Sequence, residues 1–195
     1  IEWSYDLLSE PERLLLRRSA VFVSDWTLEA AEAVCVGPDP AFGSTGMTLE
    51  VMDILLRLVD KSLIVAEEKA RQARYRMLES IRQYASEKLM ESGEEESLRA
   101  RHLEFFLTFS EQAEPKLNSA EQLIWLNELG AEYANLQAAL VWSRQARSLQ
   151  PELRLAVATE QLADVQLLLG QGTQAIARYQ EALEWSQKVE GADKM

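Results

Sequence analysis

Four cations stand close together in one short stretch of this 195-residue chain, and they are the side chains best suited to bind phosphate. The four are Lys69, Arg71, Arg74 and Arg76. Lys and Arg donate charge-assisted hydrogen bonds to phosphate oxygens, either of DNA or of a nucleotide. Within the same stretch only Glu67 and Glu68 oppose them. We expect this basic cluster to contact protein or a nucleotide phosphate rather than DNA.

Side chains for covalent catalysis are sparse. His102 is the only histidine, and the only cysteine, Cys35, lies far upstream in the sequence. Nucleophilic catalysis needs a base beside its nucleophile and a group that orients the base, and zinc sites draw on several Cys or His ligands. We expect a structural or surface role for His102, a core position for Cys35, and no catalysis or metal binding by this chain.

No phosphate-binding loop is present in the sequence. The pattern G-x-x-x-x-G-K-[ST] does not occur, and the one tight glycine cluster, Gly43-Ser44-Thr45-Gly46, lacks its lysine. We therefore expect no cofactor bound by this chain itself. The acidic run at 94–96 could be imagined as a cation site, but its composition is that of a solvated linker.

The elements of the first half predict a winged-helix domain at residues 1–92. Ser9-Glu10-Pro11-Glu12 carries the signals of a capped helix start, and further helices are expected from Thr27, from Thr48 and around Ile81. Two strands, at 62–66 and 73–78, are expected to flank a polar tip at 67–72. We expect the first apolar cluster to pack under the first helix; it comprises Ile1, Trp3, Tyr5, Leu7 and Leu8.

The acidic segment 91–96, which a glycine interrupts, is the expected domain boundary. Helical spacing then predicts helices at 98–113, after Pro115, at 152–169 and at 173–188. The last pair matches the spacing of a tetratricopeptide repeat, with repeat-packing positions at Leu162, Ala163, Gly170, Ala175, Tyr179 and Ala182. The expected fold class is mainly α: a winged helix with a small β-hairpin, then tetratricopeptide-like antiparallel helix pairs at 97–195, forming an α-superhelix.

The charge balance limits the partners that this chain can have. The net charge is −12, and residues 1–92 hold 11 Lys and Arg against 16 Asp and Glu. An acidic chain opposes duplex binding, which requires a basic face. No apolar run reaches the roughly 18–20 residues that a membrane span requires. A single cysteine is consistent with a cytoplasmic protein.

Five segments resemble, in the same order, the bacterial STAND-type regulators, which are signal-transduction ATPases that include LuxR-family and SARP-like transcriptional regulators. They are WSYDLLSEPERLLLRRSAVF (3–22), WTLEAAEAVC (26–35), LLRLVDKSLI (55–64), RYRMLESIRQYASEKLMESGE (74–94) and EYANLQAALVW (132–142). The resemblance covers nearly the whole chain. It implies a winged helix that packs on an upstream nucleotide-binding module, and repeats that sense an inducer or a protein.

The resemblance also implies where ADP or ATP of the parent protein would be sensed. Relatives in animals and plants place a Met-His-Asp motif at the nucleotide phosphate, and its equivalent here is Met77-Leu78-Glu79. Leu78 cannot donate to a phosphate, so Arg74 or Arg76 would have to reach it instead. The motor and the DNA reader would both lie outside this chain, which we expect to be a fragment truncated at both ends.

Two other functions fit the same residues. The first is a stand-alone DNA-binding winged-helix protein with a helical dimerisation tail, in which the third helix enters the major groove and the wing touches phosphate. The second is a plain scaffold of helical repeats. Duplex binding with a steep salt dependence would favour the first, and an inert wing would favour the second.

Overall fold

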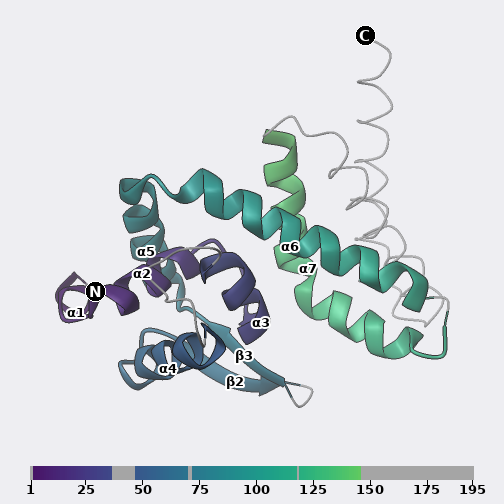
Figure 1. Ribbon diagram of the computed structural model, residues 1–195, viewed down its shortest axis with the longest axis horizontal. Helices are drawn as coiled ribbons and strands as arrows, with labels where there is room; N and C mark the ends of the chain where they lie inside the picture. The colour runs from purple at the N-terminus through teal and green to yellow at the C-terminus, as the bar shows by residue number, and fades with distance from the viewer. Residues whose placement is uncertain (1, 37–46, 70–71, 118, 146–195) are drawn as a thin grey trace, which may run out of the picture. The chain divides into compact units, whose positions relative to one another are not determined.

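The computed structural model describes residues 2–36, 47–69, 72–117 and 119–145. These residues form a mainly helical fold with one small antiparallel sheet, as the sequence predicts (Figure 1). The elements are α1 (Glu2–Asp6), α2 (Glu10–Ser19), β1 (Trp26–Thr27), α3 (Leu28–Ala31), the π-helix η1 (Glu32–Val36), α4 (Met47–Asp60), β2 (Val65–Lys69), β3 (Gln72–Arg76), α5 (Glu79–Ser92), α6 (Glu95–Lys116) and α7 (Gln122–Gln145).

The start of α2 forms as its sequence predicts. The backbone N–H of Ser9 donates to Glu12 Oε2 at 2.7 Å, which completes a capping box. Thr27 is the N-cap of α3: its side-chain hydroxyl accepts the backbone N–H of Ala30 at 3.1 Å. The predicted cap at Thr48 is wrong, since α4 begins one residue earlier, at Met47.

The sheet has the order β1-β3-β2, and all of its pairs are antiparallel. Trp26 pairs with Tyr75, and Glu67 pairs with Arg74. Sequence analysis missed β1, because two residues give no detectable period. It also misplaced β2, which begins at Val65 rather than Ser62 because Ser62 ends α4 in a left-handed conformation (φ 57°).

The core of the first half gathers apolar side chains from α2, η1, α4 and α5. Phe22 and Trp26 are fully buried and their rings stack with centroids 5.1 Å apart. The other large or central members are Leu15, Leu16, Val34, Leu55, Leu58, Ile64, Ala85 and Leu89. Burial of such side chains contributes roughly 1.5–3 kcal/mol each, so this cluster is what fixes the helices around the sheet.

Burial of the N-terminal apolar cluster is only partial. Leu8 is buried as expected, and the ring of Tyr5 meets that of Tyr84 edge-on at 5.4 Å. Trp3 and Leu7 are exposed, at 75% and 61%, so the expectation that they pack under the first helix is wrong. The reason is that α1 is a helix, which turns successive side chains away from one another, whereas the prediction treated the cluster as one patch.

The chain divides into two compact units, residues 1–105 and 106–195, so the division falls inside α6. In the second unit the described core combines α6 and α7 through Phe106, Ala113, Leu117, Leu126, Leu129, Leu136, Ala139 and Leu140. Pro115 lies inside α6, in its last turn, rather than before a new helix. It has no N–H to donate to the carbonyl of Glu111, and the helix ends one residue later, at Lys116. No helix of the described residues is long and apolar enough to cross a membrane.

Candidate functional site: the wing and the third helix

The wing is the hairpin of β2 and β3, and its central cation is buried. Arg74 is only 3% exposed, and its guanidinium is held by Asp25, which lies one residue before β1. Arg74 Nε donates to Asp25 Oδ1 at 2.9 Å, and Nη2 donates to the backbone carbonyl of Asp25 at 3.1 Å. Arg74 therefore joins the sheet to the segment that leads into α3. It would have to leave this pair before it could reach a phosphate.

The two other described wing cations are also paired with carboxylates. Lys69 Nζ lies 2.5 Å from Asp25 Oδ2, so Asp25 binds both Lys69 and Arg74. Arg76 donates to Glu67 Oε1, at 3.0 Å from Nε and 2.8 Å from Nη2. Arg71, the fourth member predicted from sequence, lies outside the described residues. The structure thus brings Lys69 and Arg74 together on a single carboxylate and places Arg76 on another.

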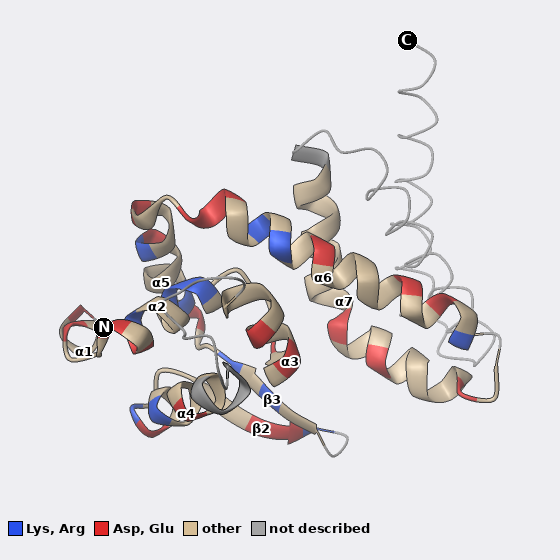
Figure 2. Cartoon of the chain, viewed as in Figure 1, with Lys and Arg blue, Asp and Glu red and all other residues tan. Residues whose placement is uncertain are grey.

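These pairs keep the carboxylate of Asp25 ionised. Its burial acts to raise its pKa, but the hydrogen bonds and charges of Lys69 and Arg74 outweigh burial and hold the pKa below its ordinary value. The described wing carries three cations and two anions, Glu67 and the exposed Glu68, and Asp25 adds a third carboxylate beside it. Figure 2 shows acidic residues of β2 in red and basic residues of its partner strand β3 in blue.

Helix α4 is the helix that the sequence predicted as the third of the winged helix, and its exposed face carries both acidic and basic residues. Asp53, Leu56, Arg57 and Asp60 are its exposed members beyond residue 50. Lys61, which follows the helix, donates to both oxygens of Glu12 at 2.8 Å and so is neutralised by α2. Among the described cations of residues 8–90, Arg57 alone has no carboxylate within ion-pair distance. A phosphate approaching this face would meet two carboxylates and one arginine.

Leu78 lies at the N-cap of α5 and is 47% exposed. Its backbone carbonyl accepts the N–H groups of Ile81 and Arg82 at 2.9 Å. The position is accessible, as a phosphate-sensing residue requires, but leucine offers no donor. Contact of this site with a nucleotide module stays a prediction.

Two residues considered for catalysis are core residues. Cys35 is fully buried, and burial, only partly opposed by Ser19, raises its pKa to about 12. His102 is 0% exposed, its ring lies 5.5 Å from that of Phe22, and burial lowers its pKa to about 3. A thiol and an imidazole in these states are poor nucleophiles and bases at neutral pH. In the described ranges, no group of three or more His, Cys, Asp and Glu could hold a metal ion.

Glu67, named from the sequence as an acid opposing the wing cations, does bind one of them, Arg76. Sequence reasoning missed Asp25, which binds Arg74, and missed that Glu12, found as a capping residue, also binds Lys61. Each of these two pairs joins residues 49 positions apart along the chain, so no local spacing reveals them. The repeat-packing residues predicted between 162 and 182 lie outside the described residues.

Comparison with known proteins agrees with this architecture. A family model described as “Winged helix-turn-helix domain” matches residues 8–90. A protein of Mycobacterium tuberculosis (strain ATCC 25618 / H37Rv) named “Putative HTH-type transcriptional regulator” is 40% identical over 157 residues, 80% of this chain and 17% of that protein. A protein of the same name from Mycobacterium bovis matches equally.

A second Mycobacterium tuberculosis protein, named “Uncharacterized protein”, is 42% identical over 102 residues, 52% of this chain and 25% of that protein. No solved structure matches the chain. The chain spans about 17% of the length of the regulators that it resembles. Residues 8–90 therefore have the fold of a winged helix, and further helices follow it. The matched description names a helix-turn-helix, a motif that binds DNA in other proteins, so the expectation that this chain does not bind DNA stays a prediction.

Proposed function

We propose that this chain is a regulatory part of a transcriptional regulator, in which the winged helix contacts protein rather than DNA. The observation that carries the proposal is the pairing of every described wing cation with a carboxylate of the same domain. A duplex-binding surface gains its affinity by replacing counterions on phosphates with free Lys and Arg. A wing whose cations already hold carboxylates gives little of that gain.

The resemblance to STAND-type regulators supports a particular protein partner. We propose that the chain lies downstream of a nucleotide-binding module of its parent protein and transmits the state of the helices at its C-terminal end to that module. ADP or ATP would bind the parent module, and Arg76 and Leu78 would be the accessible wing positions nearest to it. The helices beyond residue 97 would bind an inducer or a protein. This chain would turn over no ATP by itself.

The proposal is tested by binding of the 195-residue chain to fluorescently labelled random 30-base-pair duplexes, measured by anisotropy at low and high salt. We expect no binding in excess of that shown by an acidic control protein. The matched variant E67Q/E68Q releases Arg76 and removes two negative charges. It should gain salt-dependent duplex binding, which shows that the assay detects a basic wing.

The rival function is direct DNA binding by a winged helix-turn-helix protein. The family match and the names of the relatives favour it, as does the exposed Arg57 on α4. If the unmodified chain binds duplexes with an affinity that falls steeply with salt, and R57A weakens that binding, the protein-contact proposal is wrong. Loss of about one unit in the salt slope on R57A would indicate one phosphate contact.

A further inference from the structure

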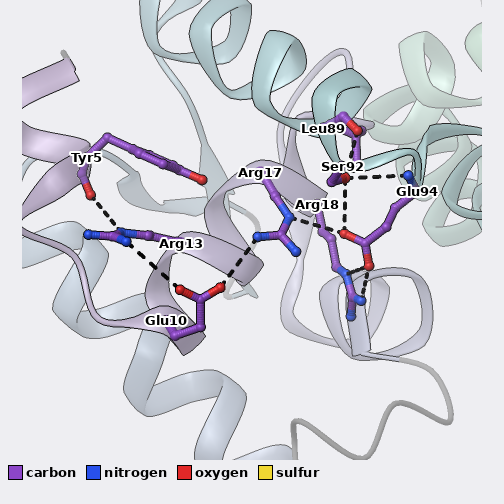
Figure 3. A network of polar contacts seen from close by, with 8 residues as sticks. All are labelled: Tyr5, Glu10, Arg13, Arg17, Arg18, Leu89, Ser92 and Glu94. Atoms are coloured by element: carbon purple, nitrogen blue, oxygen red, sulfur yellow. Dashed lines mark hydrogen bonds and ion pairs between the residues drawn. The ribbon is translucent and has the colours of Figure 1, made fainter.

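The carboxylate of Glu94 joins the start of α6 to α2. Gly93 ends α5 in the left-handed conformation (φ 72°), and Glu94 follows at once. The carbonyl of Glu94 accepts the N–H of Leu98 at 3.0 Å, which places Glu94 at the start of α6. Figure 3 shows its side chain turned toward Arg17 and Arg18.

The contacts of this carboxylate reach through α2 into a third element. Glu94 Oε2 accepts from Arg17 Nε at 3.1 Å, and Oε1 accepts from Arg18 Nε at 3.1 Å and also from Arg18 Nη2. Arg18 is 3% exposed and also donates to the carbonyl of Cys35, in η1, at 2.9 Å. The side chain of Arg18, which lies in α2, thereby connects the start of α6 to η1.

A second carboxylate, that of Glu10, lies within ion-pair distance of Arg17. Glu10 Oε1 lies 3.8 Å from Arg17 Nη1, and the Glu10 side chain is 75% exposed. If Glu94 withdraws, Arg17 can close on Glu10 while Arg18 keeps the carbonyl of Cys35. Arg17 contacts both carboxylates at once in the structure, and Glu10 also lies 3.9 Å from Arg13 Nη1, so Arg17 would keep one carboxylate partner after Glu94 withdraws.

We propose that Glu94 is a releasable latch that holds the first turn of α6 on the winged helix, with Glu10 as the alternative partner of Arg17. Helix α6 continues beyond Phe105 into the second unit, so it is the covalent route between the C-terminal helices and the winged helix. A signal that acts on those helices would open or close the latch. The inference holds whether the winged helix contacts protein or DNA.

Hydrogen–deuterium exchange of the whole 195-residue chain at neutral pH tests this proposal, with the variants E94Q and E10Q. E94Q keeps an acceptor but removes the charge, and amides 98–104 should exchange about tenfold faster while those of α4 are unchanged. E10Q removes the competitor for Arg17, so the same amides should exchange more slowly, by up to about threefold. The matched control is E96Q, at an exposed position in the same turn.

The opposite signs of E94Q and E10Q distinguish a latch from a merely structural ion pair. Faster exchange throughout the chain in E94Q would show that Glu94 only supports global stability, and the proposal would be wrong. Unchanged or faster exchange at 98–104 in E10Q would show that Glu10 does not compete, and would also overturn it. Failure of the proposed function is read separately, because it rests on duplex binding and not on exchange.

Discussion

Acidification should destabilise the first unit through a single side chain, His102. The imidazole is buried against Phe22, and its pKa falls from 6.5 to about 3 because burial penalises the charged form. In the unfolded chain the same group titrates near 6.5. Between these two pKa values His102 binds a proton in the unfolded state but not in the folded state. The free energy of unfolding therefore decreases as pH falls below 6.5.

The size of this effect follows from the shift. A difference of one pKa unit is worth about 1.4 kcal/mol, so the loss reaches about 5 kcal/mol near pH 3 and about 2 kcal/mol at pH 5. Stability should be fully present above pH 6.5. The half-buried carboxylates of Asp25 and Glu94 have lowered pKa values, so the stability that they contribute is lost only as pH falls toward and below their ordinary pKa values of 3.8 and 4.5. Since His102 is the only histidine, the interval from pH 6.5 to 5 isolates it.

The measurement is urea unfolding followed by circular dichroism at pH 7.0, 6.5, 6.0, 5.5 and 5.0, for the unmodified chain and for H102L. The unmodified chain should lose about 2 kcal/mol between pH 7 and pH 5, and H102L should lose almost none. The comparison rests on the slope, so it remains valid if H102L is less stable overall. An equal slope in both proteins would refute the assignment of the proton uptake to His102.

Two further predictions concern the wing and the end of α4. D25N should lower the free energy of unfolding by about 3 kcal/mol, because it removes the charge that compensates the buried Arg74. The control D53N, at an exposed site, should change the free energy of unfolding by less than about 0.5 kcal/mol. Equal urea midpoints for the two variants would contradict the role of Asp25 as the counter-charge of Arg74. S62G should stabilise the protein by about 0.5–1 kcal/mol, since Ser62 holds φ 57°. The control S86G, inside α5, should destabilise the protein by a similar amount. Thermal unfolding measures both variants, and a midpoint that does not rise in S62G, or does not fall in S86G, would contradict the prediction.

Local patterns were sufficient wherever the physical cause was local. The capping box of Ser9 and Glu12 depends on residues three positions apart and formed as predicted, and the helix expected from Thr27 begins there, with Thr27 as its N-cap. The hairpin was predicted, but the bounds of its strands were displaced, because the two strands are linked by the charged cross-strand pair of Glu67 and Arg76 rather than marked by apolar alternation. The two-residue strand β1 exists only through its pairing with β3, so its own sequence could not show it.

The sequence by itself determined the order of the main helices and of the hairpin, since helix caps, apolar periods and a polar hairpin tip act over a few residues and need no tertiary partner. It also located every cation of the wing. Only the tertiary structure decided what those cations do. Asp25 binds Arg74 across 49 positions of sequence, and Glu94 binds Arg17 across 77. Such pairs form when packing brings distant segments together, and the sequence alone gives no distance between them.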